Sequence, residues 1–535
     1  MAFLVFRPCF QTASFKIKVL QLNIIKANPL AKDSYMNGIS TGVLISLGAY
    51  FLVMIGIGIY AYFKQANDTE GYMLGGRNLS PAVTALSAGA SDMSGWLLLG
   101  LPGYMYADGV VSVWIAIGLT TGAFLNYIIV APRLRVYTEI ADNAITLPDY
   151  FANRFEDKSH MLRVISAVVI ILFFTVYTAA SLVGGGKLFE SSLNLPYTTG
   201  LWVTAGVVVT YTLFGGFLAV SMTDFVQGII MLFALVIVPI VAFTDLGGVS
   251  AVTDSVRSID PSLLNLTSGM TILGIISLLA WGLGYFGQPH IIVRFMAIRS
   301  VKDVPTARNI GMSWMIVSLI GSLATGFAGR AYVQKTSMVL DDPETIFLVF
   351  TQFLFHPLVA GFLLAAILAA IMSTISSQLL VVSSSLTKDV YKLFFDKDAP
   401  EARQVLVGRI SVVLVAVVAI MLASDPDSSV LSLVSNAWAG FGSAFAPLVV
   451  FSLIWRGMNR NGAVAGMVVG ALTVILWVYG GFTTADGVPL NDWLYGIVPG
   501  FILSTIAIFA VSIMTGGPKP SITAKFKEME RIIKE

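Results

Sequence analysis

The most informative segment of the sequence is Ser80-Pro-Ala-Val-Thr-Ala-Leu-Ser-Ala-Gly-Ala-Ser-Asp-Met-Ser-Gly-Trp96, which continues as Leu-Leu-Leu-Gly-Leu-Pro102. It has the length and apolar character of a membrane span, yet Asp92 lies near its middle. A carboxylate at bilayer depth costs about 2.5–3.5 kcal/mol on insertion scales, so such a residue usually has a function. The small residues around Asp92 favour a break in the helix that turns carbonyls inward. An anion among free carbonyls suits a small hard cation.

The composition is that of a polytopic, all-α membrane protein. The 535 residues are 56% hydrophobic and 12% charged, and the mean hydropathy is +0.83, whereas soluble proteins carry about 25% charged residues. The net charge of +2 gives no sign of nucleic-acid binding, and a single cysteine, Cys9, excludes an internal disulfide framework. No hydrolase triad, redox motif or phosphate loop is present.

Thirteen apolar runs are each near the length of about 20 residues that a span needs. They cover residues 40–62, 80–103, 109–131, 161–185, 198–220, 223–243, 267–289, 308–331, 357–387, 406–424, 429–456, 462–480 and 492–515.

Charge bias between the loops predicts the orientation. With the loop after the first run placed in the cytoplasm, 23 Lys and Arg residues lie on that side and 4 on the other. An odd number of spans then puts the N-terminus outside and the C-terminus inside a plasma (inner) membrane.

The remaining five basic residues lie within residues 1–35, on the predicted outer side. This segment has no long apolar region or clear cleavage site, so a signal peptide is not indicated. We expect translation to start at Met36; the alternative is an N-terminal tail. Residues 36–516 then form the transporter domain, and residues 517–535 a cytoplasmic tail with a basic amphipathic helix.

The connecting segments are short. Residues 132–160 predict one or two amphipathic cytoplasmic helices, and residues 332–356 allow a short outer helix. Residues 244–266 read as an acidic, polar outer loop.

Two of the apolar runs are interrupted. The run at 80–103 breaks around Asp92, and the run at 267–289 ends in Trp281-Gly-Leu-Gly-Tyr-Phe-Gly-Gln-Pro289. Counted start to start, five runs separate them. Interrupted spans at matching positions of two halves indicate a transporter built on inverted repeats. The repeats would cover about 80–243 and 267–424, which is a 5+5 arrangement.

Two segments are candidates for a cation site. In Ala90-Ser-Asp-Met-Ser-Gly-Trp96, unwound backbone and side-chain oxygens can hold a cation; the alternative is a buried Asp92 that caps a broken helix. In the run at 357–387, the hydroxyls of Ser373 and Thr374 can complete a sodium shell with the Ala370 carbonyl. Those hydroxyls can equally bond to the preceding turn or to a neighbouring helix.

Aromatic residues mark a candidate solute site. Trp281, Tyr285 and Pro289 are spaced by four, so they share one face if the helix continues that far, and the intervening glycines leave room for a ligand. Ordinary packing between helices is the alternative, as it is for Tyr177.

Two charged residues complete the candidates. Asp224 follows a very short cytoplasmic turn, where it can lie on an ion exit path or cap the next helix. Arg77 is a cytoplasmic loop charge or a gating residue.

Together these residues resemble the solute:sodium symporter family from about Met36 to the C-terminus. The resemblance rests on segments 74–79, 84–98, 147–158, 281–290 and 437–445. It implies a thirteen-helix, LeuT-like inverted-repeat fold.

The resemblance also implies roles for individual residues. Sodium would lie between the carbonyls of Ala90 and Met93 on one helix and Ala370, Ser373 and Thr374 on another, with Asp92 in support. The substrate site would comprise Ser94, Gly95, Trp96, Tyr177, Trp281, Tyr285 and Pro289. Arg77 and Asp224 would assist coupling.

The expected function is sodium-driven uptake of L-proline, with no enzymatic activity, no cofactor besides Na⁺ and no obligate protein partner beyond the lipid bilayer. One alternative is symport of another amino acid, a carboxylate or a sugar. Another is a transporter-like sensor, although only about 20 residues follow the last run. A channel is disfavoured because the candidate sites are not rings of repeated filter residues.

Overall fold

The computed structural model describes residues 40–64 and 69–535. The expectations for residues 1–35 and the start at Met36 lie outside the described residues. Within the described part, the structure is helical, and isolated bridges join Leu79 to Ile298 and Thr483 to Pro489. The all-α prediction is therefore confirmed.

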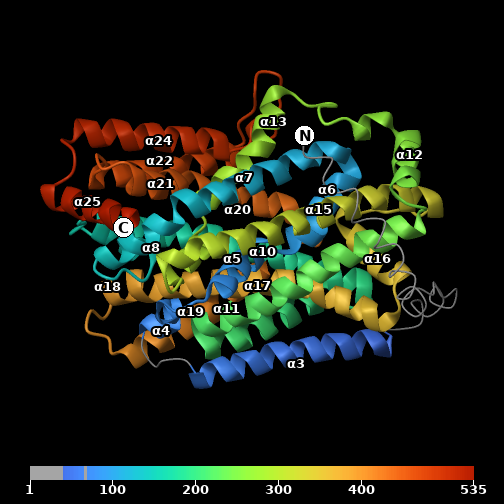
Figure 1. Ribbon diagram of the computed structural model, residues 1–535, viewed down its shortest axis with the longest axis horizontal. Coiled ribbons are helices and arrows are strands. Elements are labelled where there is room, and N and C mark those ends of the chain that lie inside the picture. The colour runs from blue at the N-terminus through green and yellow to red at the C-terminus, as the bar shows by residue number, and fades with distance from the viewer. Residues whose placement is uncertain (1–39, 65–68) are drawn as a thin grey trace.

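The long helices lie alongside one another in a bundle (Figure 1). They are α3 (Thr41–Lys64), α7 (Val113–Ile129), α10 (Met161–Leu193), α11 (Tyr197–Asp245), α15 (Val304–Thr336), α17 (Pro357–Ser385), α19 (Glu401–Leu422), α20 (Val430–Ala444) with α21 (Ala446–Ile454), α22 (Arg460–Tyr479) and α24 (Ile497–Met514).

Within the described part, ten helices are long and apolar enough to cross a membrane, or eleven if one bent pair counts as a span. The predicted polytopic membrane fold is confirmed, whereas length and composition do not reproduce the count of thirteen. Two features account for the difference between thirteen and eleven. The break near Asp92 leaves α5 (Pro81–Asp92) too short and merges the following residues with α7, and the first half of α11 does not qualify on its own.

The first predicted interruption is present. Helix α5 begins at Ser80, whose hydroxyl accepts a hydrogen bond from the Val83 N–H, and Pro81 occupies its first turn. It ends at Asp92, after which Met93 has φ −82° and ψ 76°. The chain resumes in the π-helix η2 (Trp96–Gly100) and α6 (Leu101–Asp108).

The second predicted interruption is also present. Helix α13 (Ile272–Leu279) passes into the 3₁₀-helix η5 (Ala280–Phe286), and after Gln288 the chain turns by 41° into α14 (Pro289–Ala297). The two broken segments lie side by side at one end, because the Leu79 N–H donates to the Ala297 carbonyl and the Arg299 N–H to the Leu79 carbonyl.

Short helices gather at the two ends of the bundle (Figure 1). We call the left end of that view the α8 end; it carries α8, α18 and α25, and the right end carries α12 and α16. The short elements are α4 (Thr69–Leu74), η1 (Gly75–Arg77), η3 (Gly109–Ser112), α8 (Ala131–Ile140), α9 (Leu147–Arg154), α12 (Val249–Ile259), η4 (Pro261–Leu264), η6 (Val301–Asp303), η7 (Pro343–Thr345), α16 (Ile346–Leu354), η8 (Leu386–Tyr391), α18 (Lys392–Phe394), α23 (Leu490–Trp493) and α25 (Pro520–Lys534).

These elements test the expectations for the connecting segments. Helices α8 and α9 confirm the helices expected in 132–160, α16 confirms a short helix within 332–356, and α25 confirms the tail helix. The expectation of a plain polar loop at 244–266 is wrong, since it contains α12. Val252 and Val256 lie one turn apart and are buried against Ala331 of α15. The i, i+4 spacing of these two apolar residues could have predicted the helix from the sequence.

Helices α3 and α24 lie at opposite edges of the bundle in Figure 1. Each presents large apolar side chains outward, for example Leu52, which is 72% exposed, and Ile513, which is 70% exposed. Such faces suit contact with lipid chains.

Candidate functional site

The break after α5 is organised around the backbone carbonyl of Asp92. This oxygen accepts hydrogen bonds from the Ser94 N–H at 2.9 Å, the Trp96 indole N–H at 3.2 Å and the Tyr177 hydroxyl at 3.2 Å. Ser94 is fully buried, and its hydroxyl accepts from the Trp96 N–H at 3.5 Å. Gly95 lies against Ile371 of α17. The Tyr177 hydroxyl, which sequence alone could assign to ordinary packing, therefore supports the unwound backbone.

Helix α17 faces this break and closes a cluster of oxygens. The Ser373 hydroxyl donates to the Ala90 carbonyl at 2.7 Å and lies 3.1 Å from the Ala370 carbonyl, which also accepts from Thr374 at 3.2 Å. The Ser94 N–H, which a continuous helix would direct to the Ala90 carbonyl, donates to Asp92 instead. The structure thus brings Ala90 together with three predicted sodium ligands of α17.

The carboxylate of Asp92 points elsewhere. Its Oδ2 accepts a hydrogen bond from the Tyr285 hydroxyl, and its Oδ1 has no partner among the described residues. It lines a cavity of about 30 Å³ together with Met93 and Tyr285. The α17 residues Ala370, Ser373 and Thr374 are not part of that lining.

Trp281 lies in an aromatic cluster with residues from three other parts of the chain. Its ring centroid is 6.3 Å from Trp96, 6.4 Å from Trp438 and 5.5 Å from Tyr495. The Trp438 indole donates to the Trp281 carbonyl at 2.7 Å and meets the Tyr285 ring edge-on at 5.3 Å.

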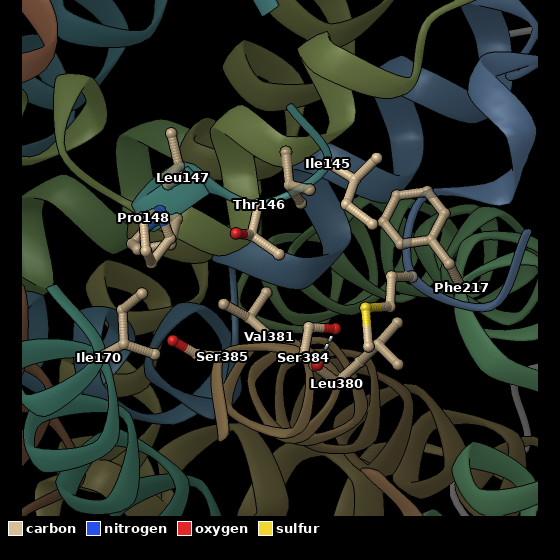
Figure 2. Close-up of a pocket in the computed structure, with 13 residues that line it drawn as sticks. Ile145, Thr146, Leu147, Pro148, Ile170, Phe217, Leu380, Val381, Ser384 and Ser385 are labelled. Carbon is tan, nitrogen blue, oxygen red and sulfur yellow. Dashed lines mark hydrogen bonds between the residues drawn. The ribbon is translucent and has the colours of Figure 1, made fainter. Parts of the chain in front are cut away.

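Trp281, Tyr285 and Pro289 would share one face only if one helix continued to Pro289, and it does not. The first two belong to the 3₁₀-helix η5, whereas Pro289 begins α14 after the turn. Proline has no N–H for an inner helical position, and the glycines before it relax the α-helical winding. Pro289 instead lines an apolar cavity. Figure 2 shows this cavity, with Ile145–Pro148 on one side and Leu380, Val381, Ser384 and Ser385 of α17 on the other.

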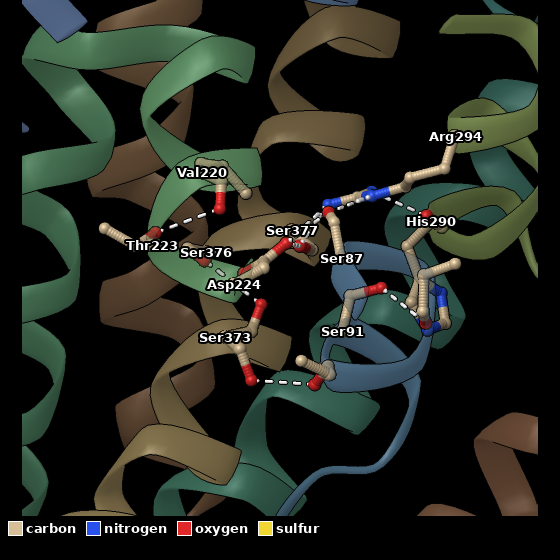
Figure 3. Close-up of polar contacts among 12 residues, drawn as sticks. Ser87, Ser91, Val220, Thr223, Asp224, His290, Arg294, Ser373, Ser376 and Ser377 are labelled. Carbon is tan, nitrogen blue, oxygen red and sulfur yellow. Dashed lines mark hydrogen bonds and ion pairs between the residues drawn. The ribbon is translucent and has the colours of Figure 1, made fainter. Parts of the chain in front are cut away.

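Asp224 lies in a buried polar network (Figure 3). Its Oδ2 accepts from the Ser87 hydroxyl at 2.7 Å, from the Ser377 hydroxyl at 3.3 Å and from Arg294 Nη2 at 3.1 Å. The guanidinium also donates to Ser87, to Ser377 and to the His290 carbonyl.

This network corrects two interpretations from the sequence. The turn in α11 is at Gly216, where φ is 51°, so Asp224 does not cap a helix but lies well inside one. Arg294, one of the 23 basic residues that the charge count above places on the cytoplasmic side, is fully buried.

Arg77 is not a free loop charge either. It is 8% exposed and donates to the Asn143 side chain at 3.0 Å, the Thr138 hydroxyl at 3.0 Å and the carbonyls of Met296 at 2.9 Å and Ala144 at 2.7 Å. Burial, and next the neighbouring Arg135, lower the pKa of its guanidinium. Arg77 therefore joins η1 to α14 and to the segment between α8 and α9.

A larger cavity, of about 450 Å³, lies at the end opposite α8. Lys187 lines it and pairs with Asp342 at 2.8 Å and with Glu344 at 2.9 Å. Glu344 also accepts from the Val430 and Leu431 N–H groups at 3.0 Å, at the start of α20.

Sequence reasoning missed several residues that complete these sites. Trp438, although within a quoted motif, received no role, and Tyr495 precedes α24 with nothing nearby to mark it. Ser87, Arg294 and Asn126 face the centre of the bundle. For Ser87 a signal existed, since it is one helical turn before Ser91 on the same interrupted helix.

A family model described as the sodium:solute symporter family matches residues 72–470. The chain is 54% identical to the osmoregulated proline transporter OpuE of Bacillus subtilis (strain 168), over 92% of this chain and 99% of that protein. It is 55% identical to the high-affinity proline transporter PutP of the same strain, over 89% and 99%. It is 54% identical to a sodium/proline symporter of Staphylococcus aureus (strain JH9), over 92% and 96%.

Solved structures share the fold. A Na⁺-coupled sialic acid symporter in a substrate-bound, outward-open state superposes with a TM-score of 0.75 at 20% identity, covering 90% of this chain and 99% of that one. A nucleobase-cation-symport-1 family transporter in a closed conformation gives 0.50 at 13% identity, covering 86% and 98%. Since the family model spans most of the chain and close relatives match it nearly end to end, the chain belongs to the sodium:solute symporter family and is a multi-pass membrane transporter, not an enzyme.

Proposed function

We propose that the protein takes up L-proline across the plasma (inner) membrane, driven by the sodium gradient, by alternating access. The observation that carries this proposal is the identity of 54–55% over nearly the whole chain with relatives named as proline transporters and sodium/proline symporters. No cofactor besides Na⁺ and no obligate protein partner is part of the proposal.

The proposed sodium site is the oxygen cluster between α5 and α17. The carbonyls of Ala90, Met93 and Ala370 and the hydroxyls of Ser373 and Thr374 are hard ligands of the kind that sodium prefers. The Ser373 hydroxyl now donates to the Ala90 carbonyl, and rotation of that hydroxyl presents both oxygens to an ion. This geometry supports the site because the helix break frees the Ala90 carbonyl from its helical partner.

The proposed proline site lies beside it. The backbone and hydroxyl of Ser94 at the break, with Gly95 and Trp96 at the start of the next helical segment, are suited to the polar groups of the zwitterion, and the rings of Tyr177, Trp281 and Tyr285 to the pyrrolidine. Pro289, at the start of α14, lies on the path towards the α8 end. Arg77 and the buried Asp224 would assist coupling on that side.

The proposal includes the membrane topology of the chain. Thirteen crossings place the N-terminus outside and the C-terminus in the cytoplasm, with the α8 end inside, since the basic loops gather there. The two interrupted segments begin inverted repeats at about 80–243 and 267–424 within the transporter domain 36–516, which residues 517–535 follow as a tail. The fold shared with other cation-coupled transporters supports this arrangement.

Sodium supplies the driving force. One positive charge that moves inward with a zwitterion gains about 2.3 kcal/mol per 100 mV of membrane potential. Coupling then requires that sodium favour the proline-binding state.

The test is uptake of labelled proline into proteoliposomes with and without an inward sodium gradient, for the wild type and Asp92→Asn. We expect sodium-dependent uptake that Asp92→Asn lowers strongly. Competition by other amino acids, carboxylates and sugars tests the alternative of another solute. Sodium-driven uptake of one of these in place of proline would overturn the assignment, and proline binding without any uptake would favour the sensor.

A further inference from the structure

Two buried carboxylates lie near the centre of the bundle, and they differ in their charge partners. Asp224 pairs with Arg294 and accepts from serine hydroxyls. Asp92 is 1% exposed, and among residues 40–64 and 69–535 its side chain accepts from the Tyr285 hydroxyl and takes part in no ion pair. A buried carboxylate without a cation is costly, so pairing with an ion brings a large gain.

A second residue near Asp92 also has a buried oxygen that accepts no hydrogen bond. Asp92 and Asn126 both line the cavity of about 30 Å³ between α5, α7 and α15. Asn126 is 1% exposed, its amide N–H donates to the Tyr285 carbonyl at 2.9 Å, and its Oδ1 has no partner in the described chain. Two of the residues that line the cavity, Asp92 and Asn126, therefore each carry a buried acceptor oxygen, Oδ1, without a donor in the described chain.

A third oxygen belongs to the same cavity. Tyr127 follows Asn126 on α7 and lines the cavity, and the described structure gives its hydroxyl no hydrogen bond. Most of the remaining lining is apolar, including Met312 and Met315. A volume of about 30 Å³ exceeds the 10–15 Å³ that one water needs, so it accommodates a small ion and about one water.

We propose that this cavity is a sodium site, in which Asp92 Oδ1, Asn126 Oδ1 and the Tyr127 hydroxyl hold the ion and sodium is the charge partner of Asp92. Oxygen ligands with one full negative charge are the coordination that a small hard cation takes. Met93 lines this cavity and also belongs to the proposed transport site, whereas Ala90, Ala370 and Ser373 are not part of the cavity lining. The inference deepens the proposed function and rests on it for the identity of the cation.

The experiment measures binding of ²²Na⁺ to the purified full-length protein in detergent, without proline. The background variant Ser373→Ala/Thr374→Val removes the hydroxyls of the proposed transport site, so that the sodium it still binds reports the cavity. We expect this background to bind one sodium per chain. Adding Asn126→Leu is expected to raise the Kd for sodium about tenfold or more, as loss of a ligand to a charged group does.

Matched variants separate this effect from damage to the fold. Asn126→Asp keeps an oxygen at the position and is expected to retain sodium binding. Asn309→Leu, the same change at an exposed position of α15, is expected to leave the Kd unchanged. Should Asn126→Leu fail to fold, Tyr127→Phe on the same background takes its place, with an expected rise in Kd of about threefold to tenfold.

The proposal is overturned if the background variant binds no sodium, because water then fills the cavity. It is also overturned if the Kd is equal with and without the substitution at Asn126 or Tyr127. A wild type that binds sodium through Asn126 but shows no sodium-driven proline uptake would overturn the proposed function and leave the cavity site standing.

Discussion

The buried pair of Arg294 and Asp224 makes a quantitative prediction. The two side chains are fully buried, with Arg294 Nη2 3.1 Å from Asp224 Oδ2. With an effective dielectric constant of about 20, unit charges at this separation attract by about 5 kcal/mol. Arg294→Met removes that attraction and leaves a buried carboxylate held by the hydroxyls of Ser87 and Ser377, so we expect it to lower the free energy of unfolding by about 3–5 kcal/mol.

A double-mutant cycle isolates the charge interaction. In Asp224→Asn/Arg294→Met neither charge remains, so the loss of unfolding free energy should be only about 1–2 kcal/mol, mainly from hydrogen bonds to the serines. The coupling energy between the two positions should therefore be about 2 kcal/mol or more. Arg299→Met is the matched control, because Arg299 is 53% exposed and pairs with Asp303 on the surface. We expect a cost below about 1 kcal/mol there.

The assay is equilibrium unfolding in mixed micelles on titration with sodium dodecyl sulfate, followed by tryptophan fluorescence. The reasoning is refuted if Arg294→Met costs no more than Arg299→Met. It is equally refuted if the double variant loses as much free energy as the two single variants combined, since the charges would then not interact.

Three further predictions follow from single contacts. A Cβ on Gly284 would clash with Nε1 of Trp438, so Gly284→Ala should displace the Trp438 ring and raise the proline KM about tenfold or more. Gly56 has open space around it, so the control Gly56→Ala should leave the proline KM unchanged. Unchanged uptake kinetics in both variants would contradict this prediction. Trp438→Phe removes the hydrogen bond that the indole donates into η5 and should cost about 1 kcal/mol, a fivefold rise in proline KM, with the sodium dependence unchanged. Hydrogen bonding by Ser521 of α25 lowers the pKa of Glu156 below its ordinary value of 4.5. Docking of α25 should therefore be intact above that pH and weaken as the pH falls through the lowered pKa. The fluorescence anisotropy of a dye attached to α25 would measure this, and an anisotropy independent of pH would contradict it.

The sequence was informative about elements and weak about the contacts between them. Hydropathy located the long helices of the described part, although α10 extends to Leu193, beyond the predicted end at 185, and α11 covers two predicted spans. The glycine, serine and proline content located both interruptions, because these are local properties of the chain. The merged helix α11 shows the limit. Its turn depends on Gly216, which is one residue among many small ones, and a hydropathy profile does not distinguish a kink from a loop.

The residues of the candidate site show the same difference between local and long-range features. Ala90, Ser373 and Thr374 could be proposed because each lies in an unusual local segment, and the structure brings them together. Arg294 was misassigned because the positive-inside rule counts charges without knowing which of them turn inward. Its partner Asp224 is 70 residues away, and nothing in either segment indicates the pairing. Side chains that become significant only through a distant partner are beyond single-sequence reasoning.

The contact between α5 and α17 offers a physical route from sodium binding to transport, given the proposed function. In the present structure the two helices are joined there by the hydrogen bond from Ser373 to the Ala90 carbonyl, a contact worth about 1 kcal/mol. A sodium ion coordinated by both oxygens would replace this hydrogen bond with a stronger link between the same helices. The ion can shift the conformational equilibrium only by its difference in affinity between the two states, and that difference is set by whether α5 and α17 are close enough to share it. The carbonyl of Asp92 fixes the neighbouring break through Tyr177 and Trp96, which are residues of the proposed proline site. The distance between α5 and α17 therefore also affects the affinity for proline. Sodium and proline would thus stabilise one arrangement of two helices, which is the reciprocal coupling that symport requires.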